Sequence, residues 1–256
     1  MARKSSFIYR TNQLIRDVAN EITSELSNKE ATKNFSEALS KRFKFQDKSD
    51  WNVLCSLMGV IKDTELAKDN FMRFGITGPT KIRDNGEYFL RLYGIVNAIY
   101  LQRSALEAFL EIFKIKGKKE ILATLNKLSI NELRNIVGAH TVNYYDNGKK
   151  TPHQIGVANM ENGIILTSNA KTGQKEFSLD KLIREYDEVF ENILIDATKL
   201  FIMKVLAVGS KKREKYLNKL ESINLERKGH LIIGEEETDD EFKVTHLIKM
   251  RTDIKW

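Results

Sequence analysis

The stretch Asp84 to Ile115, DNGEYFLRLYGIVNAIYLQRSALEAFLEIFKI, carries the strongest helical pattern in the chain. Apolar side chains recur along it at helical spacing and fall near one broad face. They are Phe89, Leu92, Tyr93, Val96, Ile99, Tyr100, Leu106, Phe109, Leu110 and Phe113. A helix of about 30 residues would be about 45 Å long. The sequence therefore predicts a central helix, in which Asn97 and Gln102 must find polar partners or face solvent.

Other stretches with helical periodicity lie on both sides of this central helix. They are Phe7 to Leu26, Asn28 to Phe45, Ser49 towards Phe74, Lys119 to Leu128, Leu179 to about Val208, and Ser210 to Leu225. The helix that begins at Leu179 has a wide apolar face, so we expect it to pack against the central helix. A break at Gly75 to Asn85, with Gly78-Pro79, divides an N-terminal helical region, 1–80, from a helical domain, 81–225.

The hydrophobic period changes from helical to alternating in two places. His153 to Asn159, Gly163 to Ser168 and Gln174 to Ser178 read as three short strands, with a hairpin turn at Asn162-Gly163. They predict a small antiparallel β insertion at about 153–178. A tail, 226–256, contains two further β-like runs, His230 to Ile233 and Phe242 to Met250, which can form a hairpin. The fold class is thus mainly α, a helical bundle with a small antiparallel β insertion and a C-terminal β-hairpin.

The charge of the chain is uneven. Its formal charge is +7, and Glu235 to Glu241 holds six acids and no base, so the rest of the chain carries +13 (+7 plus six). A basic body suits a polyanion such as RNA, although solvated lysines alone can give the same balance. The sequence shows no apolar stretch of about 18 uncharged residues and no apolar leader at its start. We therefore expect no membrane association and a cytoplasmic protein.

The stretch Leu133-Arg134-Asn135-Ile136-Val137-Gly138-Ala139-His140 holds the residues best suited to chemistry. Ser129, with Glu132 three residues on, predicts a capping box and hence a short helix that carries Arg134. Gly138 weakens this helix one turn later, which frees His140 to turn back towards Arg134. A permanent guanidinium charge and an imidazole that titrates near neutrality could then share one cleft, as phosphoryl chemistry requires.

Arg134-Asn135, four further residues and His140 resemble the Arg-polar-x(n)-His signature of HEPN domains (higher eukaryotes and prokaryotes nucleotide-binding). The similarity extends to the long helical segment before the motif, roughly Arg83 to Ile115, and loosely to the helix after Leu179. Many HEPN proteins are metal-independent endoribonucleases in which two protomers bring their motifs together. The resemblance therefore implies a HEPN-like bundle, a homodimer with a composite cleft, and RNA as substrate. By analogy it also implies a toxin–antitoxin or antiviral defence setting, with an antitoxin or regulatory protein as a further partner.

In this reading His140 transfers protons and Arg134 holds the phosphate oxygens and offsets the charge that develops on them. Asn135, at the polar position of the signature, would orient His140 or contact the ribose. The products would be a 2′,3′-cyclic phosphate and a 5′-hydroxyl. No cofactor and no metal ligand are expected. Further RNA contacts are predicted at two tyrosines that can stack on bases and at two lysines in a basic turn: Tyr144, Tyr145, Lys118 and Lys119.

Two alternatives remain open on the sequence alone. The chain can be a non-catalytic HEPN-like module that binds RNA, a nucleotide or a protein, or an unrelated helical interaction protein. Arg134 would then pair with a local acid such as Glu132 or Asp146, and His140 would cap a helix. The single cysteine, Cys55, lies in an apolar run and is predicted to be a buried structural thiol.

Overall fold

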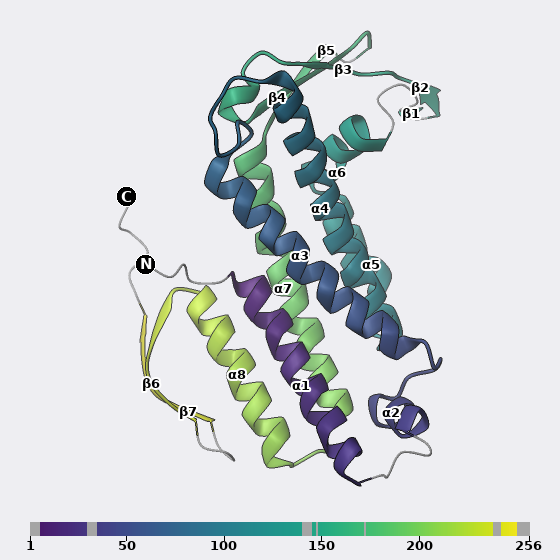
Figure 1. The fold of residues 1–256 in the computed structure, drawn as a ribbon, viewed down its shortest axis with the longest axis vertical. Coiled ribbons are helices and arrows are strands. Elements are labelled where there is room, and N and C mark those ends of the chain that lie inside the picture. Colours follow the sequence, from purple (N-terminus) through teal and green to yellow (C-terminus); the bar gives the residue numbers. More distant parts are fainter. Residues whose placement is uncertain are drawn as a thin grey trace. The chain divides into compact units, whose positions relative to one another are not determined.

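The structure, a computed structural model, describes residues 6–29, 35–139, 145–146, 148–171, 173–237 and 242–249. The fold is mainly helical with small antiparallel sheets, as predicted (Figure 1). The described helices are α1 (Phe7–Lys29), α2 (Phe35–Phe43), α3 (Asp50–Phe74), α4 (Asn85–Ile112), α5 (Lys118–Asn126), α6 (Ser129–Arg134), α7 (Leu179–Val205) and α8 (Lys211–Arg227). None of these helices is both long enough and apolar enough to cross a membrane.

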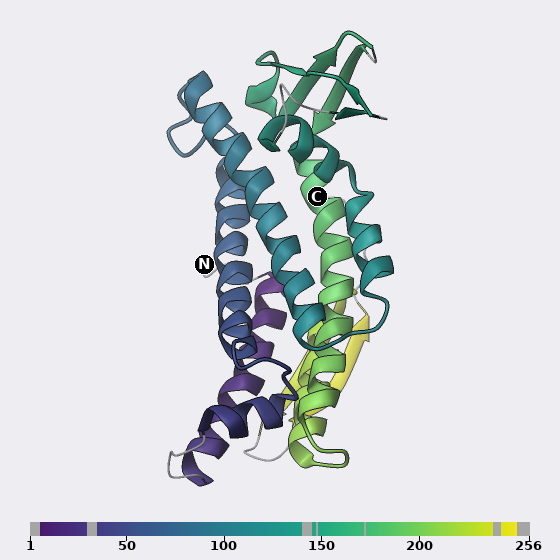
Figure 2. The ribbon, with the colours of Figure 1, turned by 90° about the vertical axis from the view of Figure 1, so that its right-hand side faces the viewer.

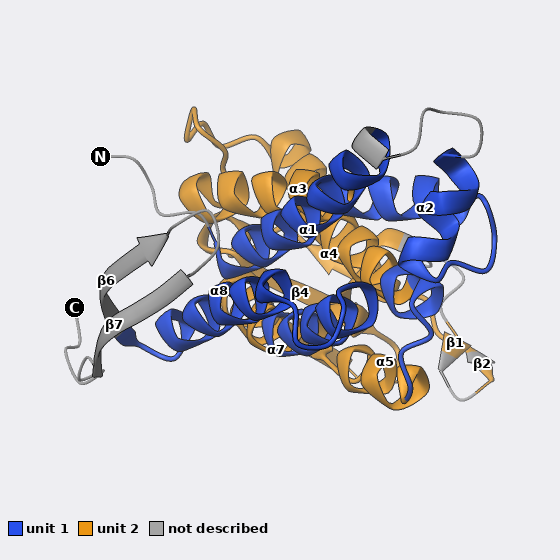
Figure 3. Cartoon of the chain, turned by 90° about the horizontal axis from the view of Figure 1, so that it is seen from below, with its two compact units in different colours: residues 1–59, 108–116, 191–256 blue, residues 60–107, 117–190 orange. Residues whose placement is uncertain are grey.

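The chain forms two compact units, each assembled from separate segments (Figure 3). Unit 1 contains Met1–Gly59, Ala108–Lys116 and Glu191–Trp256, whereas unit 2 contains Val60–Glu107 and Gly117–Phe190. The long helices α3, α4 and α7 each contribute residues to both units. Each unit therefore has its own set of packing contacts.

In unit 1, α8 lies beside α1 (Figure 1), and ion pairs join the two helices. Both guanidinium nitrogens of Arg10 bond to Glu226, with Nη1 3.0 Å from Oε2. Lys212 Nζ lies 2.8 Å from Glu21 Oε1 and also binds Glu25. Ser210 accepts a hydrogen bond from the backbone N–H of Arg213 and so caps α8 at its start.

The exposed position of Cys55 corrects one expectation from the sequence. Its thiol lies on the outer side of α3. Leu54 and Met58 are buried on the same helix. Because a helix turns by about 100° per residue, a cysteine next to a buried leucine need not share its face. The apolar run around Cys55 indicated burial, but the helical phase decides it.

A lysine with left-handed backbone follows the end of each of the helices α2 and α4. These residues are Lys44 (φ 59°) and Lys114 (φ 47°). The N–H of Lys44 donates to the carbonyl of Lys41, and the N–H of Phe45 donates to that of Ser40, at 3.3 and 2.9 Å. The same two bonds recur around Lys114. This is the Schellman pattern, in which glycine is the usual residue at the left-handed position. A side chain there costs on the order of 1 kcal/mol in backbone strain.

In unit 2 the predicted packing of α7 against α4 is confirmed. The hydroxyl of Tyr186 donates to the carbonyl of Ile99 at 3.3 Å, and the tyrosine is fully buried. Leu92, Val96 and Ile99 on α4 are buried as their spacing predicted. The central helix is thus part of the core on the side that the sequence indicated.

A buried polar network lies between α3, α4 and α7 in unit 2. Lys68 is 3% exposed, and its ammonium bonds to Glu65, Asp187 and the side-chain carbonyl of Gln102. Gln102 also donates to Glu65 Oε1 at 2.7 Å and to the hydroxyl of Thr64 at 3.3 Å. Gln102 therefore finds the polar partners that its place in an apolar face required.

The β insertion forms the sheet β3-β4-β5, as predicted, and stands beside α6 in unit 2 (Figure 2). Its strands are β3 (Gln154–Gly156), β4 (Ile164–Asn169) and β5 (Gly173–Ser178), all antiparallel. The Asn162-Gly163 reversal is not a tight two-residue hairpin. A 3-10 turn, Met160–Asn162, precedes Gly163 because the buried side chain of Met160 draws this segment into the core.

Two further hairpins complete the described strands. A short one, β1 (Tyr145–Asp146) with β2 (Lys149–Lys150), was not predicted. The C-terminal hairpin pairs β6 (His230–Glu237) with β7 (Phe242–Lys249), as expected from the two β-like runs. However, β6 continues through three glutamates of the acidic segment and pairs Glu235 with Val244. Cross-strand pairing thus extends beyond the predicted run, His230 to Ile233, into the acidic segment.

Candidate functional site

The helix that carries Arg134 begins without the predicted capping box. Leu128 is the N-cap residue, with extended backbone (φ −69°, ψ 137°), and no side chain caps the helix. Ser129 is already helical, so its hydroxyl is not at the position from which a cap reaches the third backbone N–H. Glu132, the expected partner of Ser129, instead forms an ion pair with Lys175 on β5 at 2.5 Å. This pair ties α6 to the β insertion.

The segment after Arg134 continues as a π-helical turn, Asn135–Ala139. The sequence predicted a break near Gly138, but the helix widens at Asn135 and runs on through the glycine. Ile136 and Val137 are buried on its inner side, whereas Gly138 is exposed. Short π-helical turns of this kind are frequent at functional sites. The turn therefore marks the motif as a locally irregular part of the fold.

The guanidinium group of Arg134 lies over an aromatic ring of the central helix. Its guanidinium carbon is 3.9 Å from the ring centroid of Tyr100 on α4. Its Nη1 donates to Oδ1 of the neighbouring Asn135 at 3.2 Å. Among the described side chains no carboxylate pairs with Arg134, and Glu132 is engaged by Lys175. The stacked guanidinium thus keeps most of its N–H donors available for an anionic group.

A cleft of about 340 Å³ opens beside this arginine in unit 2. It is lined by Arg134 and Gly138 from the motif and by five residues of α4: Leu90, Tyr93, Gly94, Val96 and Asn97. Asn97, which the sequence placed in an apolar face, is exposed and contributes its amide to this cleft. The cleft therefore combines one cation, one amide and an apolar wall.

The wall of this cleft continues as an exposed apolar stripe on α4, here called the α4 stripe: Leu90, Tyr93, Gly94, Asn97 and Leu101. Leu90 is 68% exposed, Tyr93 45% and Leu101 42%. A Cβ added at Gly94 would meet no atom within 4 Å. A mid-helix glycine lowers helix stability by about 1 kcal/mol relative to alanine, and no described residue of unit 2 packs closely enough to require it. The stripe thus offers a smooth apolar surface next to Arg134.

The other predicted site residues do not gather around the cleft among the described residues. His140 and Tyr144 lie outside the described residues. Tyr145 is 63% exposed on β1, where a base could stack on it. Lys118, at the start of α5, pairs with Glu107 at 3.7 Å, and Lys119 is exposed. Neither lysine lines the cleft. The structure therefore brings together Arg134 and Asn135 and leaves the two lysines in a separate part of unit 2.

The role of Tyr100 and the exposure of the α4 stripe were missed in the sequence. Tyr100 and Tyr93 were both assigned to the buried face of the central helix, but Tyr100 stacks on Arg134 and Tyr93 faces solvent. One signal was present. Asn97 is a poor core residue, and it marks the side of α4 that is not buried.

A comparison of the chain with protein-family models, curated proteins and solved structures finds no match.

Proposed function

We propose that this chain is a HEPN-like endoribonuclease that cleaves RNA without a metal ion and acts as a homodimer. The observation that carries the proposal is Arg134, an arginine without a carboxylate partner among the described residues, stacked on Tyr100 at the edge of a cleft. A planar guanidinium with free N–H groups suits two oxygens of a phosphate, and the ring contact helps to hold it at the edge of the cleft. His140, six residues on, is assigned the proton transfers by the resemblance of the motif.

The reaction joins the 2′-oxygen of a ribose to the adjacent phosphorus and breaks the bond from phosphorus to the 5′-oxygen of the next nucleotide. One base takes the proton of the 2′-hydroxyl, and one acid gives a proton to the leaving 5′-oxygen. The products are a 2′,3′-cyclic phosphate and a 5′-hydroxyl, and no co-reactant is consumed. Arg134 offsets the negative charge that grows on the non-bridging oxygens in the transition state.

One histidine cannot be base and acid at the same instant, so a single motif is incomplete for this step. A second copy of the chain would supply the other imidazole if the two Arg134 clefts met across a twofold axis. The α4 stripe supports this arrangement because it is apolar and borders the cleft. Gly94 would let a second helix approach closely.

The decisive experiment is cleavage in the presence of a chelator. The purified protein is incubated with EDTA and either single-stranded RNA or transfer RNA, and the product ends are identified. We expect cleavage, with 2′,3′-cyclic phosphate and 5′-hydroxyl ends. Binding of RNA without cleavage would favour the non-catalytic HEPN-like module. Products with 5′-phosphate ends would show that a different reaction takes place.

The dimer predicts that charges placed on the α4 stripe abolish both assembly and cleavage. In Leu90→Asp/Tyr93→Asp, two like-charged pairs would be buried at the twofold interface, which costs several kcal/mol. We expect a dimer for the wild type and a monomer for the variant by light scattering, with cleavage reduced at least about tenfold. Leu200→Asp, at a leucine of α7 that is 47% exposed in unit 1, is the matched control. A wild type that is monomeric and cleaves RNA would refute the composite site.

A further inference from the structure

A second concentration of positive charge lies in unit 1, away from any residue of the motif in the sequence. It consists of Lys44 after α2, Lys114 after α4 and Lys204 on α7, here called the lysine trio. Burial, together with the charges of Lys44 and Lys114, lowers the pKa of Lys204 below its ordinary value. Among the described residues no carboxylate forms an ion pair with a member of the trio. The ammonium group of Lys204 is thus repelled by two lysines and has no described ion-pair partner to offset them.

Aromatic packing holds the backbone of Lys44 in this place. Phe43 precedes it and stacks on Phe201 of α7 with ring centroids 6.4 Å apart. Phe45 follows it and packs against Phe113 at the end of α4, 5.7 Å between centroids. Because both neighbours pack against rings near the ends of α4 and α7, the backbone of Lys44 is held close to Lys114 and Lys204.

The other two lysines are held by the same aromatic cluster. Phe113 and Phe201 pack with centroids 4.8 Å apart, so the ends of α4 and α7 meet there. The ammonium of Lys204 donates to the carbonyl of Phe113 at 2.7 Å and lies 5.9 Å from its ring. Lys114 is the next residue along the chain. A hydrogen bond to one carbonyl leaves two N–H donors of Lys204 for a ligand.

Two members of the trio occupy positions at which the backbone favours glycine. Lys44 and Lys114 are the left-handed residues of the two Schellman turns. A positive side chain near a helix C-terminus gains from the helix dipole, which accounts for one lysine at each helix end. It does not account for the convergence of both lysines on Lys204, because convergence adds repulsion.

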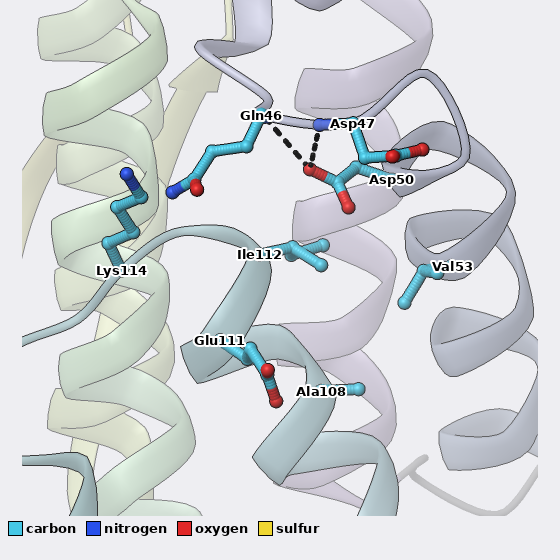
Figure 4. A pocket seen from close by; sticks show the side chains of 8 residues that line it. All are labelled: Gln46, Asp47, Asp50, Val53, Ala108, Glu111, Ile112 and Lys114. Atoms are coloured by element: carbon cyan, nitrogen blue, oxygen red, sulfur yellow. Dashed lines mark hydrogen bonds between the residues drawn. The ribbon is translucent and has the colours of Figure 1, made fainter.

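A cavity of about 580 Å³ borders the trio at Lys114 (Figure 4). Three acids line it, Asp47, Asp50 and Glu111, and the first two accept hydrogen bonds from backbone N–H groups. Oδ2 of Asp50 accepts hydrogen bonds from the N–H groups of Gln46 and Asp47, at 3.0 and 3.2 Å. The carboxylate of Asp47 accepts one from the N–H of Ser49, which lowers the pKa of Asp47. Both acids accept bonds from backbone N–H groups just before α3, and neither forms an ion pair with a member of the trio.

We propose that Lys44, Lys114 and Lys204 form a phosphate-binding site for the backbone of the RNA substrate, a second RNA contact in unit 1. The ligand class follows from three lysines whose backbones meet at one aromatic cluster and that form no ion pair with a described carboxylate, since phosphate oxygens are the acceptors that ammonium groups bind. The choice of RNA rests on the proposed nuclease function. The site reads no sequence, because contacts to phosphates position a strand without distinguishing its bases.

The test measures binding of an uncleavable 2′-O-methyl RNA longer than about 16 nucleotides by fluorescence anisotropy between about 50 and 200 mM salt. The variant is Lys44→Gly/Lys114→Gly/Lys204→Gln. Three lost phosphate contacts should reduce the slope of log K against log salt by about 2 for a single strand. The dissociation constant should rise at least about tenfold at the lower salt concentrations. Glycine relieves the left-handed backbone at both turns, so the melting temperature should not fall.

The control variant carries the same change of charge and the same type of glycine substitution elsewhere. Lys81 is also left-handed (φ 53°) and exposed, and Lys48 and Lys199 are exposed lysines. For Lys81→Gly/Lys48→Gln/Lys199→Gln we expect less than about a threefold change in affinity. An equal loss in both variants would reduce the effect to net charge and overturn the proposal.

Two further outcomes separate this site from the nuclease. Trio-dependent RNA binding by a protein that never cleaves would reject the nuclease and retain the site. Cleavage with an unchanged salt slope in the trio variant would retain the nuclease and reject the site. Inorganic triphosphate is tested in parallel. If the trio variant loses binding of triphosphate but not of RNA, the RNA assignment is overturned.

Discussion

Replacing Arg134 by alanine is expected to lower the rate of RNA cleavage by about 10³-fold or more. Arg134 would offset the negative charge that develops on the phosphate in the transition state. No other described cation lines the cleft, so none can replace it. Arg134→Lys keeps the charge but loses the planar pair of N–H donors, so we expect a loss of about 10²-fold. Single-turnover cleavage rates in EDTA measure both values.

Variants of Tyr100, the residue that contacts Arg134, test whether the position of the guanidinium matters for cleavage. Tyr100 touches the guanidinium and no reacting atom, so it is a positioning residue. Tyr100→Phe keeps the ring and should cleave within about twofold of the wild type, whereas Tyr100→Leu should lose about tenfold. Because Tyr100 acts through Arg134, adding Tyr100→Leu to Arg134→Ala should not lower the cleavage rate further.

Arg184→Ala serves as the control for general loss of positive charge, because Arg184 is an exposed arginine of α7 in unit 2. It should cleave at the wild-type rate. Wild-type activity in Arg134→Ala would remove the basis of the proposed function. A loss of cleavage rate in Arg184→Ala as large as that in Arg134→Ala would also remove the basis of the proposed function.

Replacing Lys68 by methionine is expected to lower the free energy of unfolding by about 3–5 kcal/mol. The substitution leaves Glu65, which is 7% exposed, and Asp187 without the ammonium that both carboxylates bind. Methionine fills much of the same volume, so the loss comes from buried charge rather than from a cavity. Urea denaturation followed by circular dichroism measures it, with Lys62→Met, at an exposed lysine of α3, as the control.

The contribution of Lys68 to the pH dependence of stability has a defined sign. Burial opposes the charge of Lys68, but Glu65 and Asp187 outweigh burial and raise its pKa above the ordinary value of 10.5. Because the folded-state pKa is raised, the stabilisation is fully present below about pH 10.5 and is lost as the pH rises through the folded-state pKa. In Lys68→Met the deficit should shrink in acid, where the carboxyl groups take up protons. A deficit that is constant with pH would point to packing instead.

Removing all three charges together tests whether unpaired buried charge causes the loss of stability in Lys68→Met. Lys68→Met/Glu65→Gln/Asp187→Asn leaves no unpaired buried ion, and we expect it to recover at least half of the stability lost in Lys68→Met. A triple variant as unstable as the single one would show that hydrogen bonding to Gln102, and not charge pairing, stabilises this part of unit 2.

The helices and the β insertion were predictable because each repeats one local pattern over many residues. The stripe of Leu92, Val96 and Ile99 defines α4, and alternation defines β4. The buried ammonium of Lys68 was not predictable, since it depends on Gln102 and on Asp187, which is distant in the sequence. Sequence patterns record which side of a helix is apolar. They do not record which polar side chains meet inside the protein.

At the candidate site the motif residues could be named, but their surroundings could not. Arg134 was chosen from its spacing, whereas its contact with Tyr100 arises only when α6 packs on α4. Ser129 was misread as a cap because its residue type fits that role; the helix starts at Ser129, which places Leu128 at the cap. The placement of the trio likewise needed the fold, since its lysines lie far apart in the sequence and no short motif joins them.

The π-helical turn at Asn135–Ala139 makes the length of this segment adjustable. Such a turn accommodates one residue more than an ordinary helical turn, and each helical residue rotates the chain by about 100°. Deleting a single residue between Ile136 and Gly138 would restore regular helical phase and redirect everything that follows. Insertions and deletions, rather than substitutions, are therefore the changes by which the direction of the chain after Arg134 can be reset in one step.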